Sequence, residues 1–244
     1  MLFVSPSKIA SYFYHECERF LYYHSLSKTS KLAMNIPKEI VENQYGNTAI
    51  MNGGIAWEEK VVTSYLGDEV KLADHESSTL SSRFFKFEEL VEELKNPSKR
   101  FIYQPTFTVP ERFYEKYGID RGKITFSDCR PDLIECIPTE SGYLFRIIDV
   151  KSSEVLKVSH QVQTALYGMI LNTILEEQGI PGEVELEETA VWLFEEENPH
   201  YTSVTHLIPY LEDFLSTQLN SLSEKELEEV FWHLDYRCEW CSLF

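Results

Sequence analysis

Apolar positions in the second half of the chain change from a period of two to a helical period. Between 101 and 150, alternating β-branched and aromatic residues predict three strands, at 101–109, 124–137 and 143–150. The turn of a hairpin is expected at 138–142, between the last two strands. Residues 159–177 then carry an apolar stripe at helical spacing, and Gly179 follows as a helix end.

The remaining elements are shorter. We expect further strands at 189–194 and 201–206 and further helices at 209–222 and 224–231. In the first half, Ser5 and Pro6 begin an apolar and aromatic run that predicts a helix over 5–26, with Cys17 near its middle. A polar loop at 27–54 is followed by a helix at 55–66, closed by Gly67, and by another at 77–95 that ends before Pro97.

This succession of helices and strands predicts an α/β protein, and 244 residues are enough for one domain over 1–244. No apolar run reaches the roughly 18 residues that span a bilayer, and the first residues lack the pattern of a secretory signal. We therefore expect a cytoplasmic protein with no membrane partner.

The charge of the chain is unevenly distributed. The formal net charge is −18, but residues 171–244 hold 17 acidic and 2 basic residues, whereas residues 1–170 hold 23 and 20. A phosphate backbone can therefore lie along the first part, although the overall field repels it. If the partner is DNA, we expect help from another domain or subunit.

The strongest candidate for chemistry is Asp149-Val150-Lys151, at the end of a predicted strand. Alternation along a strand places Asp149 and Lys151 on the same face. The preceding strand of the hairpin carries Asp132, and two carboxylates brought together there need a cation between them. Oxygen ligands suit Mg²⁺ or Mn²⁺, and a lysine beside such a metal suits hydrolysis of a phosphodiester. The alternative is an ordinary surface ion pair.

The surrounding sequence resembles the RecB-like branch of the PD-(D/E)XK nucleases. The family's second and third motifs are similar to Arg130-Pro131-Asp132-Leu133-Ile134 and Ile148-Asp149-Val150-Lys151-Ser152-Ser153, and its helical Gln-x-x-x-Tyr signature to Gln163 and Tyr167. The resemblance implies a restriction-endonuclease-like core, a central mixed sheet flanked by helices. It also implies metal binding by Asp132, Asp149 and the Val150 carbonyl, activation or orientation of hydroxide by Lys151, and positioning of substrate by Gln163 and Tyr167.

The family's first motif, often Gly-x-x-x-His-Glu, is less well matched. This chain has Gly53-Gly54-Ile55-Ala56-Trp57-Glu58. The resemblance makes Glu58 a metal ligand or a carboxylate that positions water. Trp57 stands where the family has histidine, and an indole cannot ligate a metal. Trp57 is then either a core residue or an aromatic that stacks on DNA.

Five cysteines in a chain without a signal peptide argue against a disulfide framework. Cys17, in a block with Ser5, Pro6, Tyr14 and Arg19, and the pair Cys238 and Cys241 resemble an iron–sulfur subgroup of these nucleases, found in nuclease-helicase enzymes and CRISPR-associated nucleases. The resemblance implies a 4Fe–4S cluster that joins distant parts of the chain. Cys-x-x-Cys alone also suits zinc or redox chemistry.

The fourth ligand of that cluster is expected about six residues after Cys241, whereas the sequence given ends at Phe244. We therefore expect the sequence to be the N-terminal part of a longer polypeptide. Cys129 and Cys136 flank Asp132 and are expected to be buried strand residues.

Two functions follow as the main hypotheses, because a third, a redox protein with Cys238 and Cys241 as its active pair, leaves the Asp149 and Lys151 pattern unexplained. The first is a Mg²⁺- or Mn²⁺-dependent deoxyribonuclease that acts on single-stranded or end-bearing DNA in repair, recombination or defence. The second is a weak or inactive DNA-binding clamp that serves a helicase or a CRISPR adaptation complex. Intact Asp132, Asp149 and Lys151 favour the enzyme, whereas Trp57 and the negative charge favour the clamp.

Overall fold

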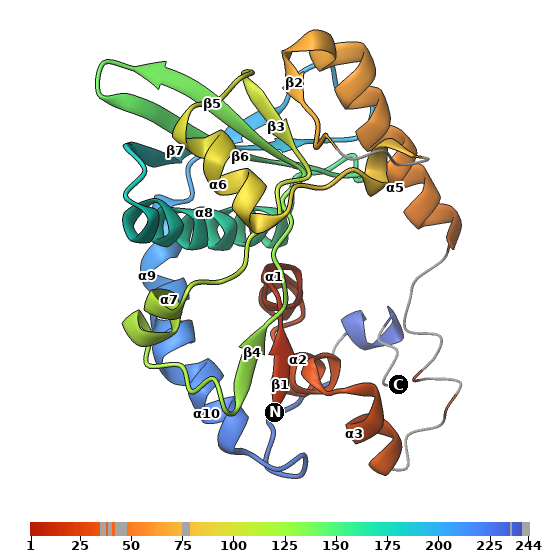
Figure 1. The fold of residues 1–244 in the computed structure, drawn as a ribbon. Helices are drawn as coiled ribbons and strands as arrows, with labels where there is room; N and C mark the ends of the chain where they lie inside the picture. Colours follow the sequence, from red (N-terminus) through yellow and green to blue (C-terminus); the bar gives the residue numbers. More distant parts are fainter. Residues whose placement is uncertain (35–37, 39–40, 42–47, 75–78, 235, 241–244) are drawn as a thin grey trace.

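A six-stranded mixed sheet organises the computed structural model, which describes residues 1–34, 38, 41, 48–74, 79–234 and 236–240 (Figure 1). Helices flank this sheet, so the α/β prediction is confirmed. The strands, in their order across the sheet, are β2 (Val70–Lys71), β3 (Phe101–Tyr103), β5 (Leu133–Thr139), β6 (Gly142–Val150), β7 (Gly182–Trp192) and β8 (His200–Thr202).

The centre of the sheet is the hairpin of β5 and β6. These strands pair antiparallel with Leu133 opposite Ile148, and Thr139 opposite Gly142 leaves a two-residue turn. β6 then pairs parallel with β7, and the crossover between them contains α8 (Val158–Gln178). The end of β6 therefore lies near the start of α8, as in other parallel crossovers.

One face of the sheet is covered by α8, and α1 (Pro6–His15) packs against α8 in turn (Figure 1). The apolar residues of α8 enter the larger core cluster together with α6 (Phe87–Lys95) and α7 (Glu111–Lys116). A second, parallel sheet of β1 (Leu2–Val4) and β4 (Ile124–Phe126) joins the N-terminus to this core.

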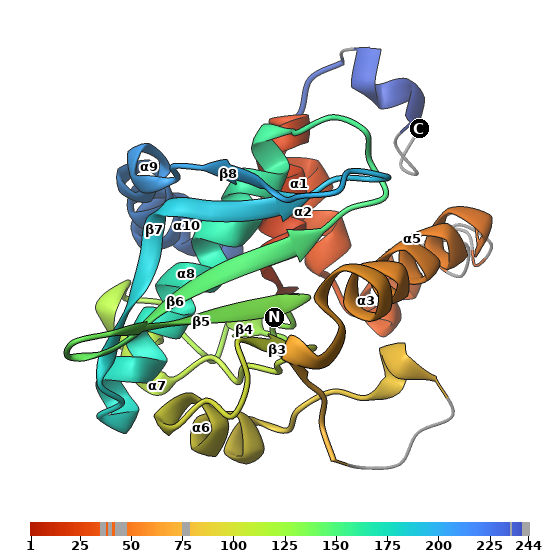
Figure 2. The ribbon, with the colours of Figure 1, turned by 90° about the horizontal axis from the view of Figure 1, so that it is seen from above.

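The opposite face of the sheet is covered only in part. There α5 (Thr48–Lys60) and the π-helical turns that continue it (Val61–Leu66) lie beside the C-terminal end of β6 (Figure 2). They contribute Trp57, Val61 and Val62 to a smaller apolar cluster against Leu133 and Ile148. This cluster closes the sheet next to the candidate site.

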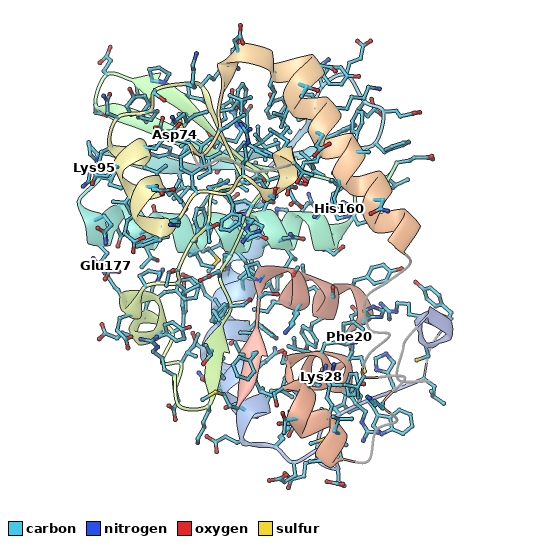
Figure 3. All side chains as sticks on the ribbon, turned by 45° about the vertical axis from the view of Figure 1, so that its right-hand side comes forward. Phe20, Lys28, Asp74, Lys95, His160 and Glu177 are labelled. Carbon is cyan, nitrogen blue, oxygen red and sulfur yellow. The ribbon has the colours of Figure 1, made fainter. Side chains whose placement is uncertain are left out.

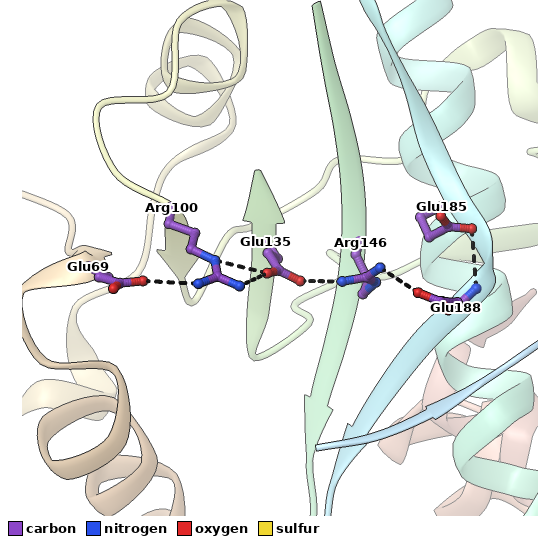
Figure 4. A network of polar contacts seen from close by, with 6 residues as sticks. All are labelled: Glu69, Arg100, Glu135, Arg146, Glu185 and Glu188. Carbon is purple, nitrogen blue, oxygen red and sulfur yellow. Dashed lines mark hydrogen bonds and ion pairs between the residues drawn. The ribbon is translucent and has the colours of Figure 1, made fainter. Parts of the chain in front are cut away.

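A row of charged side chains crosses the same face of the sheet (Figure 4). Glu135 on β5 lies between Arg100, at 2.7 Å, and Arg146 on β6, at 2.6 Å. Arg100 continues to Glu69 and Arg146 to Glu188. Glu135 is 1% exposed and Arg146 9% exposed, so each compensates the buried charge of the other.

The predicted N-terminal elements need correction. The helix expected over 5–26 is two helices, because Glu16 adopts a left-handed φ of 52° and ends α1. Cys17 is the N-cap of α2 (Glu18–Ser25) rather than a residue of a helix centre. The loop expected at 27–54 contains α3 (Lys28–Ala33) and the start of α5, at Thr48.

Strand and helix boundaries also differ in several places. β3 stops at Tyr103, where Gln104 has a φ of 51°, and the strand expected at 124–137 divides into β4 and β5. β7 begins at Gly182 rather than at 189, and β8 ends at Thr202. The helix expected at 77–95 starts only at Phe87, with 77 and 78 outside the described residues.

Of the two helices predicted in the C-terminal third, one is confirmed and the other is wrong. The helix expected at 209–222 is confirmed as a continuous run formed by α9 (Ile208–Asp213), five π-helical residues (Phe214–Gln218) and α10 (Leu219–Glu224). The helix expected at 224–231 is wrong, because residues 227–229 form a turn and Val230 a bend. None of the described helices is long and apolar enough to cross a bilayer.

The charged row predicts a large effect of one buried carboxylate on stability. Glu135→Ala should lower the free energy of unfolding by roughly 3–5 kcal/mol, because it leaves the Arg146 guanidinium buried without its main counter-charge. Urea unfolding followed by circular dichroism measures this. Glu188→Ala is the matched control and should cost less than about 1 kcal/mol, because Glu188 is 62% exposed. Equal losses for both variants would contradict this role for Glu135.

Candidate active site

The site is built around an ion pair at the C-terminal end of β6. Asp149 Oδ2 lies 2.6 Å from Lys151 Nζ, and Asp149 is only 1% exposed. Burial alone would lower the pKa of Lys151, but the negative charges of Asp149, Asp132 and Glu58 outweigh it and raise that pKa. Lys151 is therefore a protonated cation among carboxylates.

Asp132 lies directly before β5 and is held against β6. Its Oδ2 accepts a hydrogen bond of 2.6 Å from the backbone N–H of Val150. Burial raises the pKa of Asp132 well above its usual range, and the charges of Glu58 and Asp149 raise it further. The hairpin thus brings Asp132 and Asp149 into one electrostatic unit, as the sequence predicts.

Glu58 reaches the same unit from α5. Its Oε1 accepts a hydrogen bond from Nε2 of Gln104. Burial raises the pKa of Glu58, the Gln104 hydrogen bond lowers it, and the charge of Asp149 adds to the increase. α5 passes close to the segment after β6, because a Cβ placed on Gly54 would be in ordinary van der Waals contact with Ser152 Oγ, at 3.8 Å.

The Gln163 and Tyr167 side chains connect the lysine to α8. Gln163 Oε1 accepts a hydrogen bond of 3.3 Å from Lys151 Nζ, and Gln163 Nε2 donates one of 3.3 Å to the Tyr167 hydroxyl. Tyr167 in turn donates to the backbone carbonyl of Arg130, at 3.2 Å. A single chain of polar contacts therefore runs from Asp149 through α8 back to the segment that carries Asp132.

The donor set fits a hard divalent cation. Glu58, Asp132 and Asp149 supply carboxylate oxygens that repel one another, and the Val150 carbonyl belongs to the residue whose N–H binds Asp132. A cation between them would offset that repulsion. In the described part of the chain, no group of three or more His, Cys, Asp and Glu side chains is clustered as a ready-made metal site.

Trp57 is a core residue. It is 2% exposed in the smaller apolar cluster, and its ring packs edge-to-face with Phe194 at 5.5 Å and with Tyr65 at 6.0 Å. The indole therefore fills space in the apolar cluster and is not available for stacking on a nucleobase. Of the two interpretations of Trp57, the structure favours the core residue.

Residues near Phe231 and Arg237 contact the turn that contains Cys17. The Arg237 guanidinium forms an ion pair with Glu16 at 3.2 Å. The backbone N–H of Arg19 donates a hydrogen bond of 3.2 Å to the Phe231 carbonyl. Cys238, in the 3₁₀ turn Tyr236–Trp240, thus belongs to a segment that contacts the Cys17 turn. Cys241 lies outside the described residues.

The other two cysteines are buried, as predicted, but only Cys136 lies in a strand. Cys129 is 1% exposed and forms an isolated β-bridge with Phe107, and Cys136 is 3% exposed on β5. Burial raises the pKa of both thiols, so neither is a reactive thiolate at neutral pH.

Two residues of the site lie outside the sequence motifs. Gln104 is 8% exposed, and its left-handed backbone aims its amide at Glu58 while its N–H donates to the Asp132 carbonyl at 2.8 Å. His160 lies on α8, one turn before Gln163. Its spacing from Gln163 and Tyr167 on a helix could have identified His160 as a site residue from the sequence. Nothing in the sequence identifies Gln104 in this way.

No family model matches the chain, and a search of curated proteins found none with significant similarity. The residues and their geometry therefore carry the functional interpretation.

The crowded carboxylates predict an unusual pH dependence of stability in chelator. Because burial raises the folded pKa of Asp132 above the unfolded value of about 3.9, the folded state binds the proton more tightly, and stability falls as pH rises between the two values. Asp132→Asn cannot titrate. It should be more stable than wild type at pH 8, and its advantage should shrink as the pH falls towards 4.

Urea unfolding in chelator at a series of pH values measures this difference. Asp128→Asn is a suitable control, because Asp128 lies nearby on an exposed stretch. A difference between wild type and Asp132→Asn that stays constant with pH would show that the Asp132 charge is not buried unfavourably.

Proposed function

We propose that this chain is a Mg²⁺- or Mn²⁺-dependent DNA nuclease with the RecB-like PD-(D/E)XK core. The observation that carries the proposal is the convergence of three sequence motifs on one ammonium group. Lys151 Nζ contacts Asp149 at 2.6 Å and Gln163 at 3.3 Å, and the contacts continue through Tyr167 to Arg130. A chance surface ion pair has no reason to be buried or to connect those motifs.

Asp132, Asp149 and the Val150 carbonyl would hold the metal, with Glu58 as a further ligand or a group that orients water. A bound Mg²⁺ or Mn²⁺ supplies polarisation of the scissile phosphate and acidifies a water molecule. Lys151 is protonated, so it orients the attacking oxygen and stabilises the negative charge that develops on the phosphate. Gln163 fixes the direction of the ammonium, and Tyr167 fixes Gln163.

The fold supports the same proposal. A central antiparallel hairpin supplies Asp132 and Asp149, and a parallel crossover through α8 returns Gln163 and Tyr167 to the end of β6. Side chains placed on strand ends and on one long helix are held more rigidly than side chains on loops. That rigidity suits a reaction in which positioning and charge stabilisation dominate.

For the cysteines we propose a 4Fe–4S cluster with Cys17, Cys238 and Cys241 as ligands. The contacts of Arg237 with Glu16 and of Arg19 with Phe231 support it, because they hold the Cys238 segment against the Cys17 turn. Such a cluster would staple two segments that are far apart in the sequence. The acidic C-terminal third also favours a partner, a helicase or another subunit, that brings DNA to the site.

The test is cleavage of end-labelled single- and double-stranded DNA by the full-length protein with Mn²⁺, with Mg²⁺ and with chelator. Wild type should cut in a chelator-sensitive manner. Lys151→Ala should lose at least about 10²-fold in rate, because it removes a charge that acts in the transition state. Circular dichroism establishes that the variant is folded.

Lys95→Ala is the matched control, since Lys95 is an exposed lysine on α6, away from the site (Figure 3). It should cut at the wild-type rate. Undiminished cleavage by Lys151→Ala would contradict the proposed role of the site. DNA binding by wild type without any metal-dependent cutting would instead favour the inactive clamp.

A further inference from the structure

His160 is a buried imidazole on α8. Its spacing of three and seven residues from Gln163 and Tyr167 places all three side chains on one face of the helix. Figure 3 labels His160 at the N-terminal end of α8, and the residue is 8% exposed. Gln163 contacts Lys151, so this face of the helix is turned towards the candidate active site.

Local hydrogen bonding fixes the tautomer of the ring. His160 Nδ1 accepts a hydrogen bond of 3.4 Å from the backbone N–H of Lys157, the N-cap residue of α8. In the neutral imidazole the proton is therefore on Nε2. Among the described residues, the contact with Lys157 is the ring's hydrogen bond, and no acceptor lies against Nε2. Because this nitrogen keeps some contact with solvent, an acceptor that arrives from outside can reach it.

The surroundings keep the ring neutral. Burial lowers the pKa of His160 to about 4, and the charges of Lys151 and Lys157 act in the same direction, against that of Asp149. The ring is thus within electrostatic reach of the ion pair at the site. A neutral N–H donor close to a lysine suits a singly charged oxygen, such as a non-bridging oxygen of a phosphodiester.

We propose that His160 Nε2 donates a hydrogen bond to the phosphate that adjoins the scissile one in the bound strand. This inference rests on the proposed nuclease function. His160 lies one turn before Gln163, about 4.5 Å further along the helix axis, so it is offset from the lysine that faces the reacting phosphate. His160 is therefore a substrate-binding residue that sets the register of the strand and takes no part in proton transfer.

The experiment pairs His160→Ala with single-stranded oligonucleotides that each carry one methylphosphonate linkage near the preferred cut. A methylphosphonate replaces a charged non-bridging oxygen by a methyl group. In wild type, one linkage adjoining the cut should raise KM by about 10-fold, the effect of losing a hydrogen bond to a charged group. His160→Ala should raise KM for unmodified DNA by a similar factor with little change in kcat.

The decisive measurement is the KM of the His160→Ala variant for the methylphosphonate oligonucleotides. In His160→Ala, the same methylphosphonate should raise KM no further, because the contact is already absent. A merely structural role of His160 would leave the full methylphosphonate effect in place. The exposed His206→Ala serves as the control and should keep the wild-type pattern.

Two results would overturn the inference. Additive increases in KM from His160→Ala and from every methylphosphonate would show that His160 touches none of these phosphates. An unchanged KM in a folded His160→Ala variant would do the same. If His160→Ala does not fold, His160→Asn replaces it, because the asparagine oxygen can still accept from Lys157 while the Nε2 donor is lost. No cutting by wild type would refute the nuclease proposal itself.

Discussion

Burying the carboxylate of Asp149 is unfavourable unless a cation lies beside it, and Lys151 supplies that cation at 2.6 Å. The two residues are brought together by the alternation at the end of β6, and β6 owes its position to the hairpin with β5 and the crossover through α8. Gln163 and Tyr167 then have a fixed ammonium to bind. The geometry of the site therefore follows from one buried ion pair and the strands that carry it.

The same region concentrates negative charge. Asp132 and Glu58 are held next to Asp149 by a backbone N–H and by the Gln104 amide, although the charge of Asp149 raises the pKa of both. Gln104 adopts a left-handed backbone to make its contact, a conformation that costs a non-glycine residue about 1 kcal/mol or more. Crowded charge and local strain are features that stability alone does not favour, and the proposed cation would offset the crowded charge.

Sequence patterns predicted the parts of the fold in which local and tertiary preferences agree. The hairpin, α8 and the shared face of Asp149 and Lys151 follow from periodicity, and they hold most of the site. The break at Glu16 was not predictable, because a left-handed glutamate has no local signal. Nor were Gln104 and the buried row of Glu135 and Arg146, since their placement depends on neighbours that are remote in sequence. Trp57 illustrates the same limit, because its motif position gave no measure of its burial.

The central claim is that Asp132 and Asp149 form a divalent metal site next to Lys151. Anomalous diffraction from crystals of the protein grown with Mn²⁺ tests it most directly. The account predicts an anomalous peak within coordination distance, about 2.0–2.2 Å, of carboxylate oxygens of both aspartates, and no such peak in Asp149→Asn crystals. Mn²⁺ bound only elsewhere on the acidic surface, with none at this pair, would contradict it.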